Sequence, residues 1–171
     1  MNYLYHDVPE NMKGNFLIPL NSMKKKNPSL YKDEVKKYKG RESLLKIKVP
    51  LLDCLWNDVV HLTAVHPRDL KKALVNSGMP KNITMKWFKI NLKSLEQDKT
   101  IVYLYKYEDE SKDYKKFNHS DLKKYGRIPA NTKKYFKKCY NEGYIPLIFH
   151  LVPHILYKGE INIKNCDIIE Y

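Results

Sequence analysis

The apolar residues along the chain recur in short runs with partial alternation, a pattern typical of β-strands. Such runs predict strands at residues 3–6, 16–20, 55–63, 85–90, 100–105, 147–151, 154–157 and 167–170, with a further extended segment at 44–52. A polar stretch at residues 106–118 is expected to be an exposed loop. The pattern therefore predicts a chain rich in sheet.

Four segments carry the start and stop signals of helices, namely residues 27–40, 66–78, 120–126 and 129–141. Asn27 can cap the first of them, Pro28 suits its first turn and Gly40 suits its end. The helices lie between the early strands, and the chain ends in strands. The sequence therefore predicts an α+β fold in a single domain, residues 1–171, with a mixed or antiparallel sheet core, flanking helices and a basic helical elaboration around 119–142.

Composition narrows the class of protein. The chain has 171 residues, 43% of them hydrophobic, so it can bury an ordinary core. No run of about 18 apolar residues is present, which argues against a membrane span. The first residues lack the pattern of a Sec-type signal peptide. Three cysteines, Cys54, Cys139 and Cys166, cannot all pair within the chain. We expect a cytoplasmic protein, although a secreted effector without a Sec signal would have the same features.

Positive charge is concentrated in two segments. The formal net charge is +13. Residues 21–50 hold ten Lys or Arg against three Asp or Glu, and residues 111–138 hold ten against two. Such a field attracts nucleotides, nucleic acid and anionic membranes. Because all but three of the 32 basic residues are lysines, which serve as solubilising point charges, a solvated basic face explains the charge as well.

The chain contains no motif of a common nucleotide fold or hydrolase. Neither G-x-G-x-x-G nor a G-K-[ST] loop occurs, and H-E-x-x-H and G-x-S-x-G are also absent. The candidate chemistry lies in six histidines: His6, His61, His66, His119, His150 and His154. A zinc site would need a third ligand in tetrahedral placement, so no metal is expected. For any single histidine a packed or surface role explains the residue, whereas for the set a shared cleft is a hypothesis, since imidazole suits proton transfer near neutral pH.

Polar and aromatic residues near these histidines have two interpretations. Asn57 and Asp58, beside Trp56, could orient a ligand, but turn formation explains both equally well. The tyrosines at positions 103, 105 and 107 alternate along one strand, where they either pack against a helix or stack on bases.

Three short patterns occur in a suggestive order. Leu4-Tyr5-His6 lies in the first predicted strand, residues 59–63 precede a helix that begins with proline, and residues 153–161 form a late strand that begins Pro-His-Ile. Together they resemble the ADP-ribosyltransferase-like proteins, the group that includes RNA 2′-phosphotransferases and DNA-modifying ADP-ribosyltransferase toxins. The resemblance implies an ADP-ribosyltransferase-like fold.

The resemblance also implies roles for particular residues. His6 matches the first-strand histidine that holds the nicotinamide ribose, so NAD is the implied cofactor. His61 stands where the group has a stacking tyrosine, and His154 where it has a catalytic glutamate. His6, His61 and His154 are therefore the candidate catalytic residues. Arg41 and Arg68, together with His6, are the candidates for binding the cofactor, because a pyrophosphate needs positive partners. The phosphotransferase branch, which uses basic and histidine side chains, tolerates this set better.

Three functional hypotheses follow. The first is an NAD- or nucleotide-handling transferase that acts on nucleic acid or protein. The second is a metal-free ribonuclease-like toxin with two histidines as acid and base. The third is a basic module that binds RNA, DNA or an acidic protein through the helix at 130–141, without chemistry. We favour the first hypothesis. Convergence of His6, His61 and His154 on one ligand would distinguish it from the other two.

Overall fold

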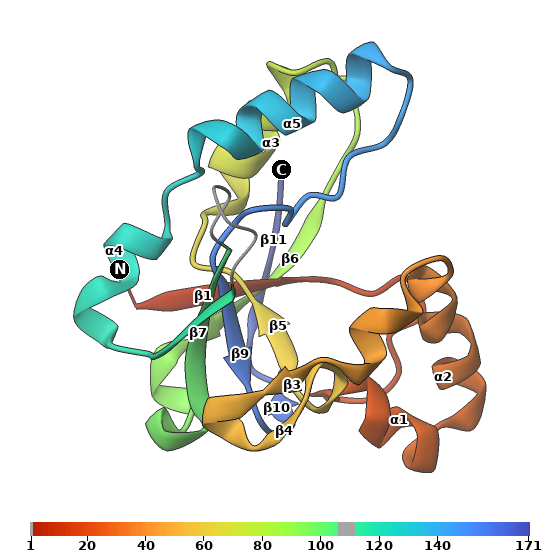
Figure 1. Cartoon of the computed structure of the whole chain (residues 1–171), viewed down its shortest axis with the longest axis vertical. Helices are drawn as coiled ribbons and strands as arrows, with labels where there is room; N and C mark the ends of the chain where they lie inside the picture. The colour runs from red at the N-terminus through yellow and green to blue at the C-terminus, as the bar shows by residue number, and fades with distance from the viewer. Residues whose placement is uncertain (1, 106–111) are drawn as a thin grey trace.

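Two antiparallel sheets form the centre of the protein in a computed structural model that describes residues 2–105 and 112–171 (Figure 1). The larger sheet has the strand order β5 (Val60–Leu62), β9 (His154–Tyr157), β7 (Thr100–Tyr105) and β8 (Lys112–Lys116). The smaller sheet has the order β1 (Tyr3–Asp7), β6 (Lys86–Asn91) and β11 (Asp167–Glu170). Backbone hydrogen bonds of 2.8 and 3.0 Å between Tyr5 and Thr63 join β1 to the residue that follows β5.

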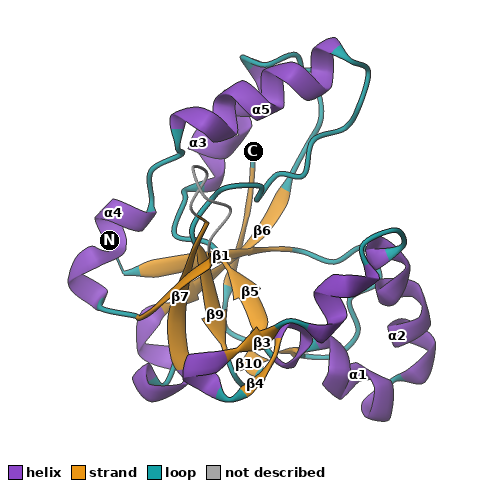
Figure 2. Ribbon diagram, in the orientation of Figure 1, coloured by secondary structure: helices purple, strands orange, loops and turns teal. Residues whose placement is uncertain are grey.

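Helices gather at two places around these sheets (Figure 2). α1 (Leu20–Lys26) and α2 (Pro28–Glu34) lie together on one side, followed by the 3₁₀ turns η1 (Val35–Tyr38) and η2 (Glu42–Lys46). α3 (Pro67–Val75) packs on α5 (Ala130–Asn141) at another end of the molecule, and α4 (Leu122–Tyr125) leads into α5. The elements that remain are short: β2 (Phe16–Leu17), η3 (Pro50–Leu52), β3 (Lys48–Val49), β4 (Cys54–Leu55), η4 (Trp56–Asp58), η5 (Leu92–Ser94), η6 (Gln97–Lys99), η7 (His119–Asp121) and β10 (Ile161–Asn162).

Local sequence explains where the helices begin. The Asn27 side chain accepts a hydrogen bond from the Leu30 amide at 3.2 Å and so caps α2. The ring of His66 accepts one from the Arg68 amide at 3.2 Å at the start of α3. Proline occupies the first turn of both helices, where its missing N–H would have no helical partner. These residues are the signals on which the sequence prediction relied.

The larger sheet has a different environment on each face. One face contributes Val60, Leu62, Val102 and Ile155 to the main apolar core. Because side chains alternate across a strand, the intervening residues point to the other face. There Ile101 and Leu156 pack with Val49, Leu52 and Val59 in a smaller cluster, under the short strands β3 and β4. The same face carries His61 and His154, whereas His6 lies in β1 of the smaller sheet.

A further apolar cluster joins α3 and α5 to the smaller sheet. Trp87 of β6 and Phe136 of α5 are fully buried in it, together with Leu70 and Leu74 of α3. This packing sets the position of α5, and through α5 the position of the segment that leads into β9.

The structure confirms the predicted α+β class with antiparallel sheets, and every strand pairing among the described residues is antiparallel. Three predicted extended segments and one predicted loop were wrong at least in part. Residues 147–151 form a turn, residues 44–52 are mostly 3₁₀ turns with a two-residue strand at Lys48–Val49, and the strand at 16–20 is paired only at Phe16–Leu17 before α1 begins at Leu20. Short apolar runs of this kind do not distinguish a strand from a turn that buries some of the same residues. The predicted loop at 106–118 is a strand over Lys112–Lys116, and Tyr107 lies outside the described residues.

None of the helices in the described part of the chain has the length and apolar character needed to cross a membrane.

Phe136 offers a test of how strongly α5 is held. Its side chain is fully buried, so Phe136→Ala removes apolar contacts and leaves a cavity. We expect the free energy of unfolding, measured by urea denaturation, to fall by about 3–5 kcal/mol. The neighbouring exposed Lys137→Ala should change it by no more than about 0.5 kcal/mol. Equal effects of the two substitutions would show that α5 is not anchored through this cluster.

Candidate functional site

Four of the six histidines lie along one region of the molecule, and we call His6, His61, His154 and His150 the histidine row. The ring centroids of His61 and His154 are 6.0 Å apart, with the ring planes nearly perpendicular. His6 is close enough to His61 to lower its pKa by charge repulsion, and His150 acts on His154 in the same way. The structure therefore brings His61 and His154 together and places His150 beside His154. His6 is near His61 through the strand pairing but not on the same side, because the bridge between Tyr5 and Thr63 puts Tyr5 on the His61 side and His6 on the other.

The strand register explains why His61 and His154 meet. His61 of β5 pairs with Leu156 of β9, and His154 lies two residues before Leu156. Residues two apart on a strand share a face, so both imidazoles project from the same side of the sheet. Tyr103 of β7 pairs directly with His154 and joins them on that side. Each histidine keeps part of its surface exposed, so a ligand can reach it.

Aromatic rings surround the pair. The Trp56 ring lies 4.5 Å from that of His61, 5.8 Å from His154 and 5.1 Å from Tyr103. Tyr103 lies 5.7 Å from His154, and Phe149 lies 6.2 Å from it on another side. Burial raises the pKa of Tyr103 to about 12, so its hydroxyl stays protonated and can donate a hydrogen bond. Trp56, Tyr103 and Phe149 thus surround the two histidines, and we call these three residues the aromatic wall. Such a wall suits a ligand that contains a flat ring.

The turn η4 holds Trp56 in this wall. Asp58 accepts a hydrogen bond from the Leu55 amide at 2.8 Å through one carboxylate oxygen, and from the Asn21 side chain at 2.8 Å through the other. The Trp56 amide donates to the Ile47 carbonyl at 2.8 Å. Asp58 is therefore a positioning residue, as the turn interpretation of its sequence proposed.

Both central imidazoles are neutral at pH 7. Burial, followed by repulsion from His154, lowers the pKa of His61 to about 3. Burial, followed by repulsion from His150, lowers the pKa of His154 to about 4. The His61 Nε2 lies 3.0 Å from the Trp56 carbonyl oxygen. Because that oxygen can only accept, Nε2 carries the proton, and Nδ1 carries the lone pair that can accept a hydrogen bond from a ligand.

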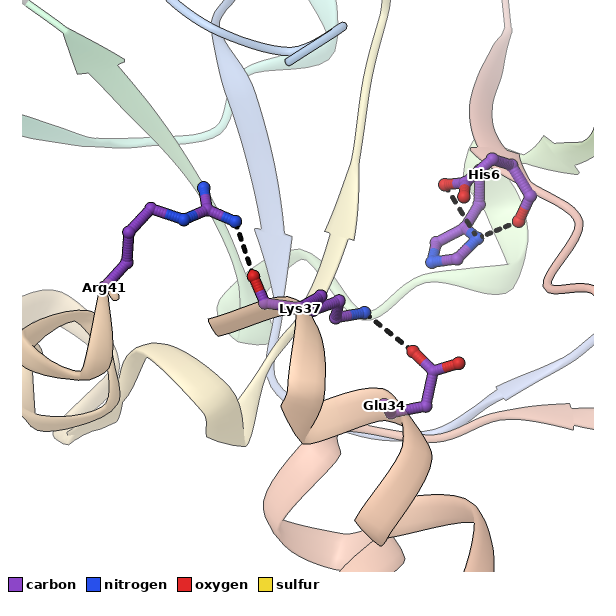
Figure 3. A network of polar contacts seen from close by, with 5 residues as sticks. His6, Glu34, Lys37 and Arg41 are labelled. Atoms are coloured by element: carbon purple, nitrogen blue, oxygen red, sulfur yellow. Dashed lines mark hydrogen bonds and ion pairs between the residues drawn. The ribbon is translucent and has the colours of Figure 1, made fainter. Parts of the chain in front are cut away.

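Two cations lie in the segment after α2, Lys37 in η1 and Arg41 just beyond it, and Lys37 pairs there with Glu34 (Figure 3). Lys37 lies near enough to His61 to lower its pKa. The Arg41 guanidinium donates to the Lys37 carbonyl at 2.6 Å, which holds the two cations close together. The Tyr135 ring packs 4.1 Å from that of His150, and burial raises the pKa of Tyr135, against a smaller opposing effect of the Arg41 charge. Arg41 therefore lies within electrostatic range of the α5 end of the histidine row.

His150 lies in the turn before β9. Its carbonyl accepts a hydrogen bond from the Thr132 hydroxyl at 3.1 Å, and its ring lies between those of Tyr135 and Tyr105. The next residue, Leu151, is buried and has a φ of 61°, in the left-handed region that non-glycine residues rarely adopt. This turn reverses the chain so that His150 and His154 lie on one side of the sheet.

Arg68 is separated from the other predicted site residues. It stacks on the Tyr171 ring at 5.3 Å, and Tyr171 contacts His66, which in turn packs on Tyr5. Tyr5 and His6 are consecutive in β1, so they point to opposite faces. Arg68 therefore lies on the other side of β1 from His6 and packs against Tyr171, so the shared cofactor site predicted for His6, Arg41 and Arg68 stays a prediction.

Sequence reasoning missed two residues of the region. Lys37 was treated as one of many lysines in a helix, although its spacing of four from Arg41 places both in successive turns. His150 was placed on a strand, where its relation to His154 could not be judged. Burial raises the pKa of Cys54, so its thiol stays protonated at pH 7 and is a poor nucleophile. Among the described residues, no three His, Cys, Asp or Glu side chains are placed to hold a metal ion.

No protein-family model, curated protein or solved structure matches this chain.

The lowered pKa values predict how stability depends on pH. Both folded-state values lie below 6.5, so between about pH 6.5 and 4 the unfolded chain binds more protons and stability falls as the pH falls. Each histidine should contribute about 1 kcal/mol to this loss per pH unit near pH 5.5. The double substitution His61→Gln and His154→Gln should therefore reduce the loss between pH 6 and pH 5 by about 2 kcal/mol.

Urea denaturation at the two pH values measures this difference, and stability changes common to both pH values cancel. His119→Gln, which alters an exposed histidine, serves as the control and should retain the full loss. An unchanged loss in the double variant would mean that His61 and His154 titrate normally in the folded protein.

Proposed function

We propose that this protein is a nucleotide-handling transferase, ADP-ribosyltransferase-like in arrangement, that binds NAD or a related dinucleotide over the histidine row. The observation that carries the proposal is the pair of neutral imidazoles, His61 and His154, enclosed by aromatic rings and approached by Lys37 and Arg41. A dinucleotide has the three matching parts: flat rings, hydroxyl-bearing riboses and an anionic pyrophosphate.

Each group of residues has a task in this proposal. Trp56, which is half-buried, stacks against a flat ring, where a contact of that kind contributes about 1–3 kcal/mol, and the buried Tyr103 supports Trp56 from behind. The neutral imidazoles exchange hydrogen bonds with ribose hydroxyls, since each has one donor and one acceptor nitrogen. Arg41 and Lys37 pair with the pyrophosphate, Arg41 through two donors and Lys37 as a point charge.

The carboxylates near the site have other partners. Asp58 holds η4, Glu34 pairs with Lys37 at 2.8 Å, and Glu160, at the far end of β9, pairs with Lys26 of α1. None of these three carboxylates is therefore free to act as the glutamate beside the ribose on which ADP-ribosyl transfer commonly depends. The histidines, Lys37 and Arg41 fit a branch that works with basic and histidine side chains, with a nucleic acid or a protein as the acceptor of the transferred group.

The ribonuclease-like alternative is less well supported. A pair of histidines that acts as acid and base near neutral pH needs one imidazolium and one imidazole. Both central histidines have pKa values of about 4 or lower, so neither is the imidazolium at pH 7. The pair suits binding and orientation better than proton donation.

Affinity for NAD tests the proposal, and the chain offers a matched pair of arginines. Arg41→Gln removes a charged donor at the proposed pyrophosphate and should weaken NAD binding by about 10- to 100-fold, equal to 1.5–3 kcal/mol. Arg68→Gln makes the same change at an arginine that packs on the Tyr171 ring and is not part of the Lys37–Arg41 pair, and it should stay within about twofold. Isothermal titration calorimetry at pH 7.5 with NAD and ADP-ribose gives both values.

Three outcomes would contradict the proposal. They are no binding of NAD or ADP-ribose by the wild-type protein, equal losses in the two arginine variants, or cleavage of a short RNA that disappears in His154→Gln. RNA cleavage that disappears in His154→Gln would favour the ribonuclease-like alternative. In that case the negative charge of the bound phosphate would raise the pKa values of the histidines.

A further inference from the structure

A basic groove lies between α3 and α5, apart from the histidine row. It has a volume of about 740 Å³, and the turn between α4 and α5 closes one side. Five cations line it: Lys72 of α3, Arg127 of the turn, and Lys133, Lys134 and Lys137 of α5. Its one acidic lining residue is Asp69. None of these residues belongs to the site proposed for the dinucleotide.

The arrangement of α5 explains how the lysines face one groove. Thr132, Phe136 and Cys139 are buried and define the inner side of the helix. Lys133, Lys134 and Lys137 lie within two turns on its solvent side, and the axial rise from Lys133 to Lys137 is about 6 Å. Among the described residues, none of the five cations takes part in an ion pair. The charges are therefore spread along the groove and available to several anionic groups in succession.

The shape of the groove selects among polyanions. A bilayer is flat and would contact only the rims of a concave surface, and the one large apolar side chain that lines the groove, Ile128, is partly buried against the cluster between α3 and α5. An acidic protein partner is expected to find aromatic or aliphatic anchor pockets, which such interfaces use for most of their energy. A nucleic-acid duplex is wide and stiff, so it would rest on the rims of a concave surface. A flexible single strand can follow the groove and place successive phosphates beside its cations.

We propose that the groove between α3 and α5 binds the phosphate backbone of single-stranded nucleic acid, without reading its sequence. No aromatic residue lines the groove, so bases are not stacked there, and lysines serve as point charges on phosphates. The net charge of +13 adds long-range attraction for such a strand. This proposal does not depend on the dinucleotide site.

The salt dependence of binding gives a quantitative test. Each phosphate neutralised on a single strand contributes about −0.7 to the slope of log affinity against log salt. Five engaged cations therefore predict a slope of about −3.5. Fluorescence anisotropy with a labelled 12-nucleotide oligouridine and a 12-nucleotide oligothymidine, between 50 and 200 mM KCl, measures this slope. We expect similar affinities for the two oligonucleotides.

The triple substitution Lys133→Gln, Lys134→Gln and Lys137→Gln leaves two groove cations, so the slope should fall to about −1.4 and the affinity at 50 mM KCl should drop at least tenfold. Lys24→Gln, Lys25→Gln and Lys32→Gln, three exposed lysines of α1 and α2, remove the same charge elsewhere and should keep the original slope. Thermal melting confirms that both triple variants fold, and NAD titration of each variant reports on the dinucleotide site separately.

Several results would overturn the groove assignment. Equal losses in the two triple variants would mean that binding is a property of the whole basic surface. No binding of either oligonucleotide at 50 mM KCl would exclude the ligand class. Binding of an oligoglutamate peptide as tight as that of the oligonucleotides would indicate an acidic protein partner instead.

Discussion

The pairing of β9 between β5 and β7 is the constraint on which the rest of the structure depends. Ile155 and Tyr157 of this strand belong to the main core, while His154 and Leu156 face the opposite side of the sheet. A slip of one residue would exchange the two faces, because side chains alternate along a strand. It would place an imidazole in the apolar core and an isoleucine among the aromatic rings. The burial that fixes the fold therefore also fixes the histidine pair.

Burial of the histidine pair lowers the stability of the folded protein at acidic pH, since the protonated imidazoles are disfavoured among the aromatic rings. What the arrangement gains is a rigid set of donors and acceptors. Trp56 is held by η4, and η4 is tied to α1 through Asp58 and Asn21. The same α1–α2 side supplies Lys37 and Arg41. The α1–α2 region thus positions both Trp56 and the two cations.

Sequence reasoning predicted the regular elements well and the irregular ones poorly. The strands at β1, β6, β7, β9 and β11 and the helices α3 and α5 carry alternation, helix periodicity or caps that act locally. The turn at 147–151 and the 3₁₀ segments at 42–52 are decided by packing against distant residues, which no local pattern records. The same distinction holds for the site. His61 and His154 were proposed together from a family resemblance. The position of Arg68 could not be predicted in this way, because it depends on the side of β1 to which the chain passes between β5 and α3.

The site draws on segments from nearly the whole chain: His6, residues 37–41, residues 56–61 and residues 150–154. Proteins are made from the N-terminus at about 5–20 residues per second, and domains fold as units. The histidine pair cannot exist before β9 has left the ribosome and inserted between its neighbours. Most of the polypeptide is thus synthesised before the pair can form, so a ribosome-bound fragment that lacks β9 is inert toward any ligand of this site.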